Sequence, residues 1–449
     1  MDAEFATLVN RAEGVLRAND LGAWTKPAPN LYPHQWNWDS AFIAIGLSHG
    51  HTERAQTEVL SLLRGQWSNG LVPQIVFNPK ATGYFPGPDV WQSERSPNAP
   101  RDVATSGITQ PPVLSTAVLA IWRNAADQDA VIPFLRRVYP HLLAYHRFLY
   151  SERNPDGDGL IVVVHPWESG LDNSPPYLDA GQRVKMTYKP TYTRLDTQHV
   201  SARNRPSDKD YDLYVYLLEQ MRAQNWDQRA YLRNAPLQVQ DVLFNSILCR
   251  ADRDLAEIAH LIGEDSTEVE GWREQTIRAI NAKLWSDEDQ TYYSYDRVAQ
   301  RLLTDDTIAG FGPLYGGAAT SERASRLIEL RLTNPREYWP DGGYPVPTTA
   351  LDSSWFDAEN YWRGPVWIAT NWLLIHGLVT YAETALAGRL TTLTIDLPER
   401  NGFREYYSPY SGEGFGTDSF SWSAALTIDL VTALESISEP GEPGLAGTT

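Results

Sequence analysis

Cysteine is almost absent from this chain. Its 449 residues include a single cysteine, so no disulfide can form within the chain, and packing of the core must hold the fold together. That residue, Cys249, lies in the apolar stretch 246–249. We interpret it as a buried structural thiol rather than a nucleophile.

Positive charge is also scarce. Lys and Arg number 38 against 56 Asp and Glu, which gives a formal net charge of −18. Nucleic-acid grooves and surfaces that bind anionic membranes need clustered Lys and Arg, so we expect neither partner. An anionic small molecule would have to be held by a local Arg or Lys against an unfavourable overall field.

Long apolar runs and targeting signals are missing as well. No stretch approaches the roughly 18 uninterrupted apolar residues that predict a membrane-spanning helix. Residues 1–20 predict an amphipathic helix with mixed charges, without the basic start and apolar run of a secretory signal. We therefore expect a soluble, cytoplasmic protein. The sequence leaves its oligomeric state open, a homo-oligomer included.

Motifs for metals and cofactors are not found either. The chain has no Gly-rich phosphate loop, no G-x-S-x-G elbow and no HExxH. His34 and His165 lack a partner at metal-site spacing and are interpreted as structural hydrogen-bonding residues. The turn at 154–159 alternates oxygen ligands as a calcium loop does, but it lacks the closing Glu, which favours a plain turn. We expect no metal and no cofactor.

Helical periodicity dominates the chain, and only residues 161–164 clearly indicate a strand. One set of segments is apolar on one face and charged on the other, as in surface helices. A second set is apolar nearly all round, as in buried helices. The first set is 53–66, 130–150, 209–224, 266–284 and 320–331; the second is 41–47, 113–122, 242–249, 366–378 and 424–434. Their alternation predicts about twelve helices in two concentric rings. This is an all-α (α/α)6 barrel in one domain, 1–437, followed by a disordered tail, 438–449.

Polar-aromatic strings precede the N-termini of the buried segments. If the inner helices run parallel, these strings meet at one mouth of the barrel. Aromatic faces stack on sugar rings and carboxylates bind hydroxyl groups, so such a mouth is typical of a carbohydrate site. Helix capping is the alternative role for Asp39, Thr417 and Asp418. The strings are residues 32–39, 105–112, 361–367 and 411–418.

Hydrolysis of a glycosidic bond needs two carboxyl groups, one protonated and one ionised. The candidate acid is Asp172, in a loop after the predicted strand and near a Trp, because an apolar ring raises the pKa of a carboxyl group. The candidate base is Glu413, whose flanking glycines would let the backbone approach a substrate. Glu168 is a second acid candidate, or else it holds its loop or a sugar hydroxyl. Glu405 is expected to pair with Arg404 or another donor.

Seven strings spread over nearly the whole chain carry a family resemblance. They are YPHQWNWDSAF (32–42), GYFPGP (83–88), TSGITQPP (105–112), HPWESGLDNSP (165–175), RPSDKDYD (205–212), YWRGPVW (361–367), and GE (412–413) with SWSAA (421–425). In this order they resemble glycoside hydrolase family 63, in particular its short bacterial branch of mannosylglycerate and glucosylglycerate hydrolases. The resemblance implies an (α/α)6 barrel and an inverting reaction, with Asp172 as the acid and Glu413 as the base.

The resemblance also implies which residues bind the substrate. An Arg fork matches a carboxylate and would overcome the −18 background, so Arg205 is expected on the carboxylate of a glycerate group. Glu168 and Arg363, from the same strings, complete the candidate set. The sugar pocket is implied to contain Trp36, Trp38, Asp39, Trp167, Tyr361, Trp362 and Trp367, and the glycerate end Tyr32, Tyr84, Gln110, Arg205 and Tyr211.

Two features depart from the family pattern. Phe420 stands where a Gln is expected before Ser-Trp, and the connection 176–204 looks individual. Both bear on the aglycone, so the alternative is an α-glucosidase of this fold acting on a small glucoside such as glucosylglycerol, kojibiose or a trehalose-like disaccharide. A lectin would need no acid and base, and an epimerase or lyase would rely on a His pair or Tyr base that does not stand out. Arg205 discriminates, because a neutral aglycone has no use for a buried guanidinium.

Overall fold

A computed structural model of the protein describes residues 3–438. Within this range helices dominate, and each strand has two or three residues. The predicted disordered tail lies outside the described residues, apart from Ser438 at the end of α16 (Ser421–Ser438). No helix of the described part is long and apolar enough to cross a bilayer.

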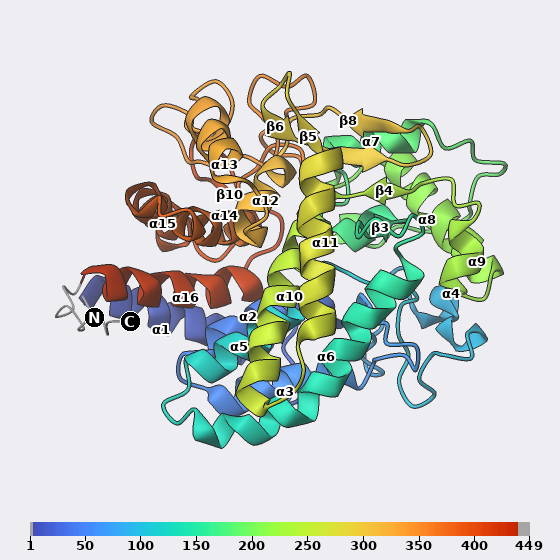
Figure 1. Ribbon diagram of the computed structural model, residues 1–449, viewed down its shortest axis with the longest axis horizontal. Coiled ribbons are helices and arrows are strands. Elements are labelled where there is room, and N and C mark those ends of the chain that lie inside the picture. The colour runs from blue at the N-terminus through green and yellow to red at the C-terminus, as the bar shows by residue number, and fades with distance from the viewer. Residues whose placement is uncertain (1–2, 439–449) are drawn as a thin grey trace.

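Six helices form a closed inner ring (Figure 1). Each contacts the next in chain order, and the last contacts the first. All residues of the first, α2, are buried, as expected for a segment that is apolar nearly all round. Cys249, on the third, is buried as predicted. The six helices are α2 (Asn37–Ser48), α5 (Leu114–Arg123), α10 (Val242–Ile262), α12 (Gly312–Gly316), α14 (Ile368–Thr380) and α16.

Glycines allow the inner helices to approach one another closely. A Cβ on Gly46 of α2 would lie 2.5 Å from the backbone of Ala425 on α16. A Cβ on Gly377 of α14 would lie 2.9 Å from the backbone nitrogen of Tyr315 on α12. Real Cβ atoms do not tolerate such distances, so the ring closes only because these positions lack a side chain.

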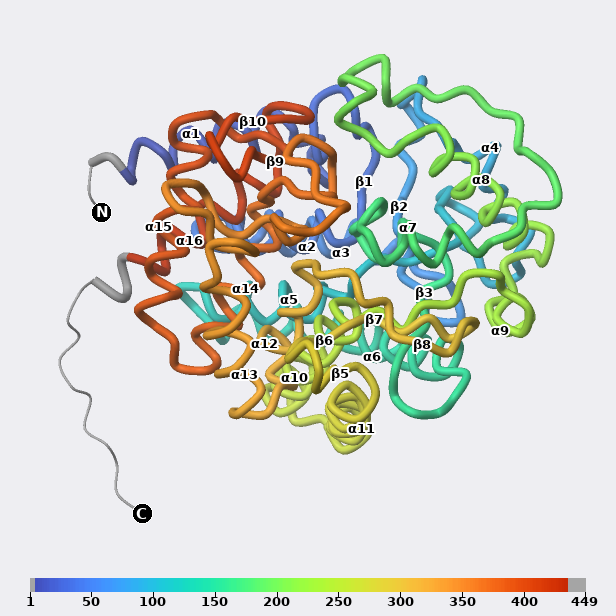
Figure 2. The backbone as a smooth tube through the Cα atoms, turned by 90° about the horizontal axis from the view of Figure 1, so that it is seen from above, coloured from blue at the N-terminus to red at the C-terminus, as the bar shows by residue number. Residues whose placement is uncertain are grey.

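A second series of helices surrounds the inner ring. α1 packs on α16, α3 on α2 and α5, α6 on α5 and α10, α11 on α10, and α15 on α14 and α16; α13 lies beside α12 (Figures 1 and 2). The outer helices are α1 (Ala3–Asn19), α3 (Thr52–Leu63), α6 (Ile132–Glu152), α11 (Thr267–Lys283), α13 (Ser321–Leu327) and α15 (Thr384–Asn401). Outer and inner helices alternate along the chain, which confirms the predicted (α/α)6 barrel of about twelve helices.

Shorter elements lie in the connections between the rings. α8 was expected among the surface helices but belongs to neither ring; Figure 1 shows it with α4 and α9 at one side of the barrel. The predicted strand 161–164 is part of a four-stranded antiparallel sheet in the order β3-β4-β7-β8. Three two-stranded sheets were not predicted: β1-β2, β5-β6 and β9-β10. The helices are α4 (Pro88–Trp91), α7 (Pro175–Gln182), α8 (Asp208–Ala223) and α9 (Gln228–Leu232). The strands are β1 (Gln35–Trp36), β2 (Ile75–Val76), β3 (Val162–Val163), β4 (Val239–Gln240), β5 (Trp285–Ser286), β6 (Thr291–Tyr292), β7 (Ser294–Asp296), β8 (Arg301–Leu303), β9 (Tyr406–Tyr407) and β10 (Gly414–Phe415).

Candidate active site

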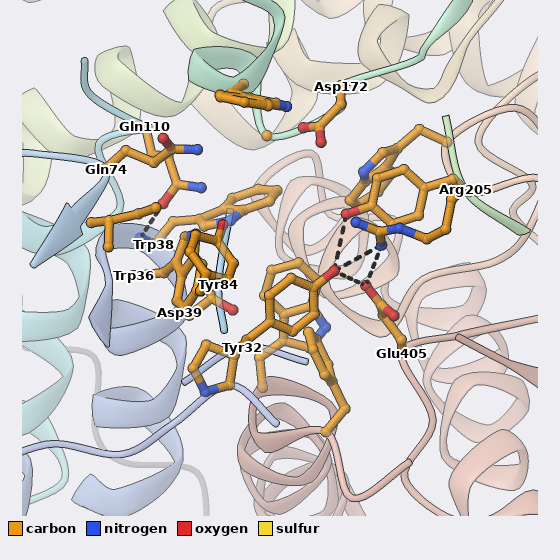
Figure 3. Close-up of a pocket in the computed structure, with 18 of the residues that line it drawn as sticks. Tyr32, Trp36, Trp38, Asp39, Gln74, Tyr84, Gln110, Asp172, Arg205 and Glu405 are labelled. Atoms are coloured by element: carbon orange, nitrogen blue, oxygen red, sulfur yellow. Dashed lines mark hydrogen bonds and ion pairs between the residues drawn. The ribbon is translucent and has the colours of Figure 1, made fainter. Parts of the chain in front are cut away.

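A pocket of about 670 Å³, including its open mouth, lies at the end of the barrel where inner helices begin (Figure 3). Asp39 is in the first turn of α2, Trp367 immediately precedes α14, and Trp422 is in the first turn of α16. Thirteen residues singled out from the sequence line it: Tyr32, Trp36, Trp38, Asp39, Tyr84, Gln110, Trp167, Asp172, Arg205, Tyr211, Tyr361, Trp362 and Trp367. Strings far apart in the chain therefore meet at one mouth.

Glu413 lies outside this pocket, contrary to the prediction. Its side chain is exposed, and its carbonyl accepts a hydrogen bond from the Ser408 amide at 2.8 Å. The flanking glycines are required by neighbouring side chains instead. A Cβ on Gly412 would lie 2.6 Å from the ring of Tyr344, and one on Gly414 would collide with Cγ of Arg404. These glycines thus make room for protein side chains and not for a ligand at Glu413.

Glu168 is buried beneath the pocket and does not line it. Its two carboxylate oxygens accept hydrogen bonds from Arg153, at 2.9 and 2.6 Å, and Oε2 also accepts from the Val164 amide at 2.9 Å. Both side chains of this ion pair are 1% exposed. Glu168 therefore anchors the loop that carries Asp172, which is the loop-holding alternative, and it is not a substrate-binding residue of this pocket.

Arg363 is the third predicted residue that does not line the pocket. Its Nε and Nη2 donate to the carbonyl oxygen of Trp355 at 3.0 and 2.8 Å. Arg363 and Trp355 line a second cavity next to α7 and α8, which shares Asp172 with the pocket. The guanidinium thus fixes the backbone at Trp355 and does not line the pocket.

Two histidines and one acidic turn have structural partners. His34 Nδ1 accepts from the Asn78 amide at 3.1 Å, and His165 Nδ1 accepts from the Trp167 amide at 3.1 Å. These contacts agree with the structural roles predicted for them. In the turn at 154–159, Asp156 forms an ion pair with Arg297 at 2.7 Å.

Sequence reasoning missed several lining residues. Glu405 was weighed and assigned to a structural pair, and Trp422 was quoted only as part of a string. The residues not singled out for the pocket are Pro27, Gln74, Ile75, Phe85, Pro86, Trp91, Gly170, Glu405, Phe420 and Trp422. Two of them adjoin a predicted residue: Phe85 follows Tyr84 in sequence, and Ile75 lies opposite Trp36 across a short strand pair.

Aromatic rings form much of the pocket wall. Trp362 stacks on Trp367 with ring centroids 3.6 Å apart and planes at 8°, and Trp38 meets Trp422 edge-on at 5.1 Å. The indole nitrogens of Trp91, Trp362 and Trp422 are buried and have no hydrogen-bond partner within residues 3–438. These nitrogens are closed off from solvent, so the wall offers a ligand the apolar faces of its rings.

Asp172 projects into the pocket from the loop that follows the 3₁₀ turn Pro166–Ser169. Gly170, at φ 76°, lets this loop lie against Trp38, since a Cβ there would be 2.6 Å from the indole ring. Burial raises the pKa of Asp172 to about 7; the negative charge of Glu405 adds to the rise, and Arg205 opposes it. A carboxyl group with this pKa is protonated in a large fraction of molecules near neutral pH.

Glu405 enters the pocket from a different side, immediately before β9 (Figure 3). Its Oε1 accepts a hydrogen bond from the Tyr32 hydroxyl at 2.7 Å and lies 3.5 Å from Nη1 of Arg205. Its Oε2 accepts from the Thr417 amide at 3.1 Å. Burial raises the pKa of Glu405, while Arg205 and these hydrogen bonds act to lower it. Asp172 and Glu405 therefore lie in different environments, because within the described part of the chain Glu405 is in contact with a cation and Asp172 is not.

Arg205 is a buried cation, 5% exposed, at the edge of the pocket. It donates to the Tyr32 hydroxyl at 2.8 Å, and its guanidinium lies 4.3 Å from the ring centroid of Tyr361. Tyr84 and Tyr211 line the pocket near this side chain. This end of the pocket is thus equipped to bind an anionic group with charge-assisted hydrogen bonds.

Comparison with known proteins identifies the family. The profile of the mannosylglycerate hydrolase MGH1-like glycoside hydrolase domain matches residues 32–423. Mannosylglycerate hydrolase of Rubrobacter radiotolerans is 43% identical over 429 residues, which cover 94% of this chain and 96% of that protein. Glucosylglycerate hydrolase of Mycolicibacterium hassiacum is 38% identical over 434 residues, covering 94% and 97%.

A solved structure agrees with these relatives. The GH63 mannosylglycerate hydrolase of Thermus thermophilus, crystallised in complex with Tris and D-glycerate, superposes with a TM-score of 0.88 at 44% identity. The match covers 94% of this chain and 99% of that one. The chain therefore belongs to glycoside hydrolase family 63, as its sequence strings predicted, and it is a glycosidase built on the mannosylglycerate hydrolase MGH1-like domain.

Proposed function

We propose that this enzyme hydrolyses the α-glycosidic bond of glucosylglycerate or mannosylglycerate to the free sugar and glycerate, with inversion at the anomeric carbon. One observation carries the proposal. Three carboxyl groups with raised pKa values, those of Asp39, Asp172 and Glu405, share one aromatic pocket with a buried guanidinium. The names of the relatives, and the D-glycerate bound to the Thermus enzyme, support the choice of substrate.

Asp172 is the general acid and Glu405 the general base in this proposal. The protonated carboxyl of Asp172 donates its proton to the glycosidic oxygen as the bond to the anomeric carbon breaks. Glu405 takes a proton from a water that attacks the anomeric carbon from the opposite face. The base is thus assigned to Glu405 in place of Glu413, because Glu405 lines the pocket and Glu413 does not.

The sugar ring occupies the aromatic part of the pocket in this proposal. Trp38 and Trp422 contact its CH groups. Asp39, whose pKa burial raises well above the usual range, binds a hydroxyl group. Hydrogen bonds of this kind replace those that the sugar makes with water, so the pocket selects a polyhydroxy ligand over an apolar one.

The glycerate group occupies the end of the pocket with Arg205, Tyr84 and Tyr211. Its carboxylate pairs with the guanidinium, and Gln110 and Tyr32 surround its hydroxyl groups. The protein carries a net charge of −18, so a local cation is required for an anionic substrate. The cytoplasmic location and the single catalytic domain over residues 1–437 stay part of the proposal.

A panel of glycosides tests the substrate. Release of free sugar is measured for glucosylglycerate, mannosylglycerate, glucosylglycerol, trehalose and kojibiose. We expect hydrolysis of one or both glycerates and far less of the neutral compounds. Proton NMR during the first turnovers should show the anomer of inverted configuration. Hydrolysis of the neutral glucosides at equal rates would favour the alternative, a general α-glucosidase.

Replacing Arg205 tests the carboxylate contact. Arg205→Ala should raise KM for the charged substrate by roughly 10- to 150-fold, since hydrogen bonds to charged groups contribute about 1.5–3 kcal/mol. A common loss of kcat is also expected for every substrate, because Arg205 lies 3.5 Å from Glu405. The ratio of KM for glucosylglycerate to KM for glucosylglycerol isolates the aglycone contact. Arg205→Lys should restore only part of it, because an ammonium does not reproduce the planar fork.

A further inference from the structure

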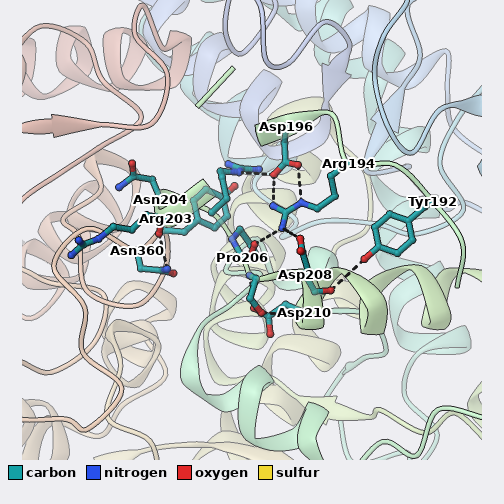
Figure 4. Close-up of polar contacts among 12 residues, drawn as sticks. Tyr192, Arg194, Asp196, Arg203, Asn204, Pro206, Asp208, Asp210 and Asn360 are labelled. Carbon is teal, nitrogen blue, oxygen red and sulfur yellow. Dashed lines mark hydrogen bonds and ion pairs between the residues drawn. The ribbon is translucent and has the colours of Figure 1, made fainter. Parts of the chain in front are cut away.

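The connection before α8 contains an ion pair that the proposed mechanism does not use (Figure 4). Arg194 donates from Nε and Nη2 to the two carboxylate oxygens of Asp196, at 3.1 and 2.8 Å. Oδ2 of Asp196 then accepts from Nε of Arg205 at 3.2 Å. Since Arg205 also contacts Glu405, charges of alternating sign run from Arg194 to the proposed base.

These side chains are largely shielded from solvent although they lie in a surface connection. The side chains of Arg194, Asp196 and Arg205 are 9%, 10% and 5% exposed. The two guanidiniums hold the pKa of Asp196 down at about 2, although burial acts to raise it. Charges that are removed from water in this way interact strongly, because solvent screens them little. Burying an ion pair does not by itself stabilise a fold, so stability alone does not account for this one.

Arg194 is held in place from several directions. Its Nη1 donates to the Pro206 carbonyl at 2.8 Å and to Oδ1 of Asp208 at 2.9 Å. Its guanidinium also lies 3.9 Å from the ring centroid of Tyr211, which lines the pocket. Arg194 therefore touches both the carboxylate that orients Arg205 and the ring beside it.

Asp196 creates an electrostatic problem for an anionic substrate. It places a full negative charge 3.2 Å from the guanidinium that is to bind the substrate carboxylate. Alone, it would compete with the substrate for Arg205 and repel it. Arg194 removes this competition, because it forms a two-pronged pair with Asp196 and returns the three side chains to a net positive charge.

We propose that Arg194 and Asp196 are positioning residues that set the selectivity for an anionic aglycone. Asp196 fixes the orientation of Arg205, and Arg194 cancels the charge of Asp196 so that Arg205 stays available to the substrate. This inference rests on the proposed function, and it adds two residues outside the pocket to the determinants of specificity.

Removing the charge of Arg194, and then of its partner, tests the inference. Arg194→Met should raise KM for the charged glycoside by about tenfold, leave KM for glucosylglycerol within about threefold, and change kcat little. The double variant Arg194→Met/Asp196→Asn removes both charges, so KM for the charged substrate should return to within about threefold of wild type. Binding of D-glycerate, measured by calorimetry, should follow the same order. Asp208→Asn is the matched control, since it removes an 85% exposed partner of Arg194 and should change neither KM.

The outcomes separate the inference from the proposed function. If the wild-type enzyme does not prefer the charged glycosides, the proposed function fails first. If wild type prefers them and Arg194→Met keeps that preference, or if the double variant binds D-glycerate as weakly as the single variant, Arg194 only anchors its loop and the inference is wrong. Arg194→Gln, which keeps a donor without the charge, repeats the comparison if the Met variant does not fold.

Discussion

Carboxylates lie at both ends of the inner helix ring, and the two ends surround them differently. At the end away from the pocket, Asp429 of α16 accepts from Nε1 of Trp372 at 2.7 Å and pairs with His49 at 2.7 Å and His376 at 3.7 Å. His376 and His49 hold the pKa of Asp429 well below its usual range although burial acts to raise it. The fold supplies this carboxylate with all the partners that its charge needs.

At the mouth, burial determines the pKa values. It raises the pKa of Asp39 well above its usual range and that of Asp172 to about 7. Among the described residues no cation lies within ion-pair distance of either carboxylate. The pKa of Glu405 is raised as well, despite its contacts with Tyr32 and Arg205. A carboxylate that has hydrogen-bond donors and cations around it in the fold stays ionised and holds helices together. A carboxylate that lacks such partners is available to a substrate and to proton transfer.

Glu405→Gln gives the largest expected effect. Loss of a general base should lower kcat by about 10²- to 10⁴-fold, and Asp172→Asn should do the same for the acid. Thermal stability should stay the same or rise, because a neutral amide costs less to bury than a carboxylate. Glu413→Gln is the matched control and should retain full kcat, since that side chain is exposed outside the pocket. A large loss in this control would reinstate Glu413 as the base.

Glu168→Gln should instead act on stability. It leaves the guanidinium of Arg153, 1% exposed, without its counter-charge, and breaking such a buried pair lowers the free energy of unfolding by about 3–5 kcal/mol. Glu268→Gln breaks an exposed pair with Arg147 and should cost less than about 1 kcal/mol. Urea unfolding measures both. If the Glu168→Gln variant is as stable as wild type but as inactive as the Glu405→Gln variant, Glu168 takes part in the reaction, as the carboxylates at the mouth do.

The barrel could be predicted because the packing of its helices determines which positions of the sequence are apolar. Segments that are apolar nearly all round must be buried, and their alternation with amphipathic segments leads to two rings. Elements that are too short to show a hydrophobic period could not be predicted. α12 has five residues, and the strands at the mouth have two or three, so neither a 3.6-residue nor a two-residue repeat can be recognised in them.

The pocket could be predicted in large part, but not its base. Glycines around Glu413 suggested a close approach to a ligand, whereas Gly412 and Gly414 make room for the side chains of Tyr344 and Arg404. The same sequence signal arises from either cause. Only the pairing of β9 with β10 decides which carboxylate faces the pocket, and in a strand one residue of shift changes the side to which a side chain points.

Asp429→Asn tests the structural role of the carboxylate at the end of the ring away from the pocket. At pH 7 it should lower the free energy of unfolding by about 1.5–3 kcal/mol, since it weakens hydrogen bonds to a charged group, with kcat almost unchanged. The folded-state pKa of Asp429 is depressed, so its stabilisation is present above the unfolded-state pKa, near 4, and is lost as pH falls toward the folded-state pKa. The stability difference between wild type and variant should therefore shrink below about pH 4. A difference that stays constant down to pH 3 would mean that charge is not what His49 and His376 recognise.

The smallest expected effect is a shift in the pH profile. Asp172 must be protonated to act as the acid, and its pKa is about 7, so kcat/KM should fall tenfold per pH unit above that value. Glu405 must be ionised, and because its pKa is raised, the acidic limb should lie above the usual value of 4.5. Arg205 lowers the pKa of Asp172, so Arg205→Ala should move the alkaline limb to higher pH while reducing the rate overall. Asp429→Asn should move neither limb, because its carboxylate has no part in proton transfer at the mouth. Profiles of kcat/KM for the three proteins, measured at constant ionic strength, decide this. An alkaline limb that Arg205→Ala leaves unmoved would show that a group other than Asp172 controls it.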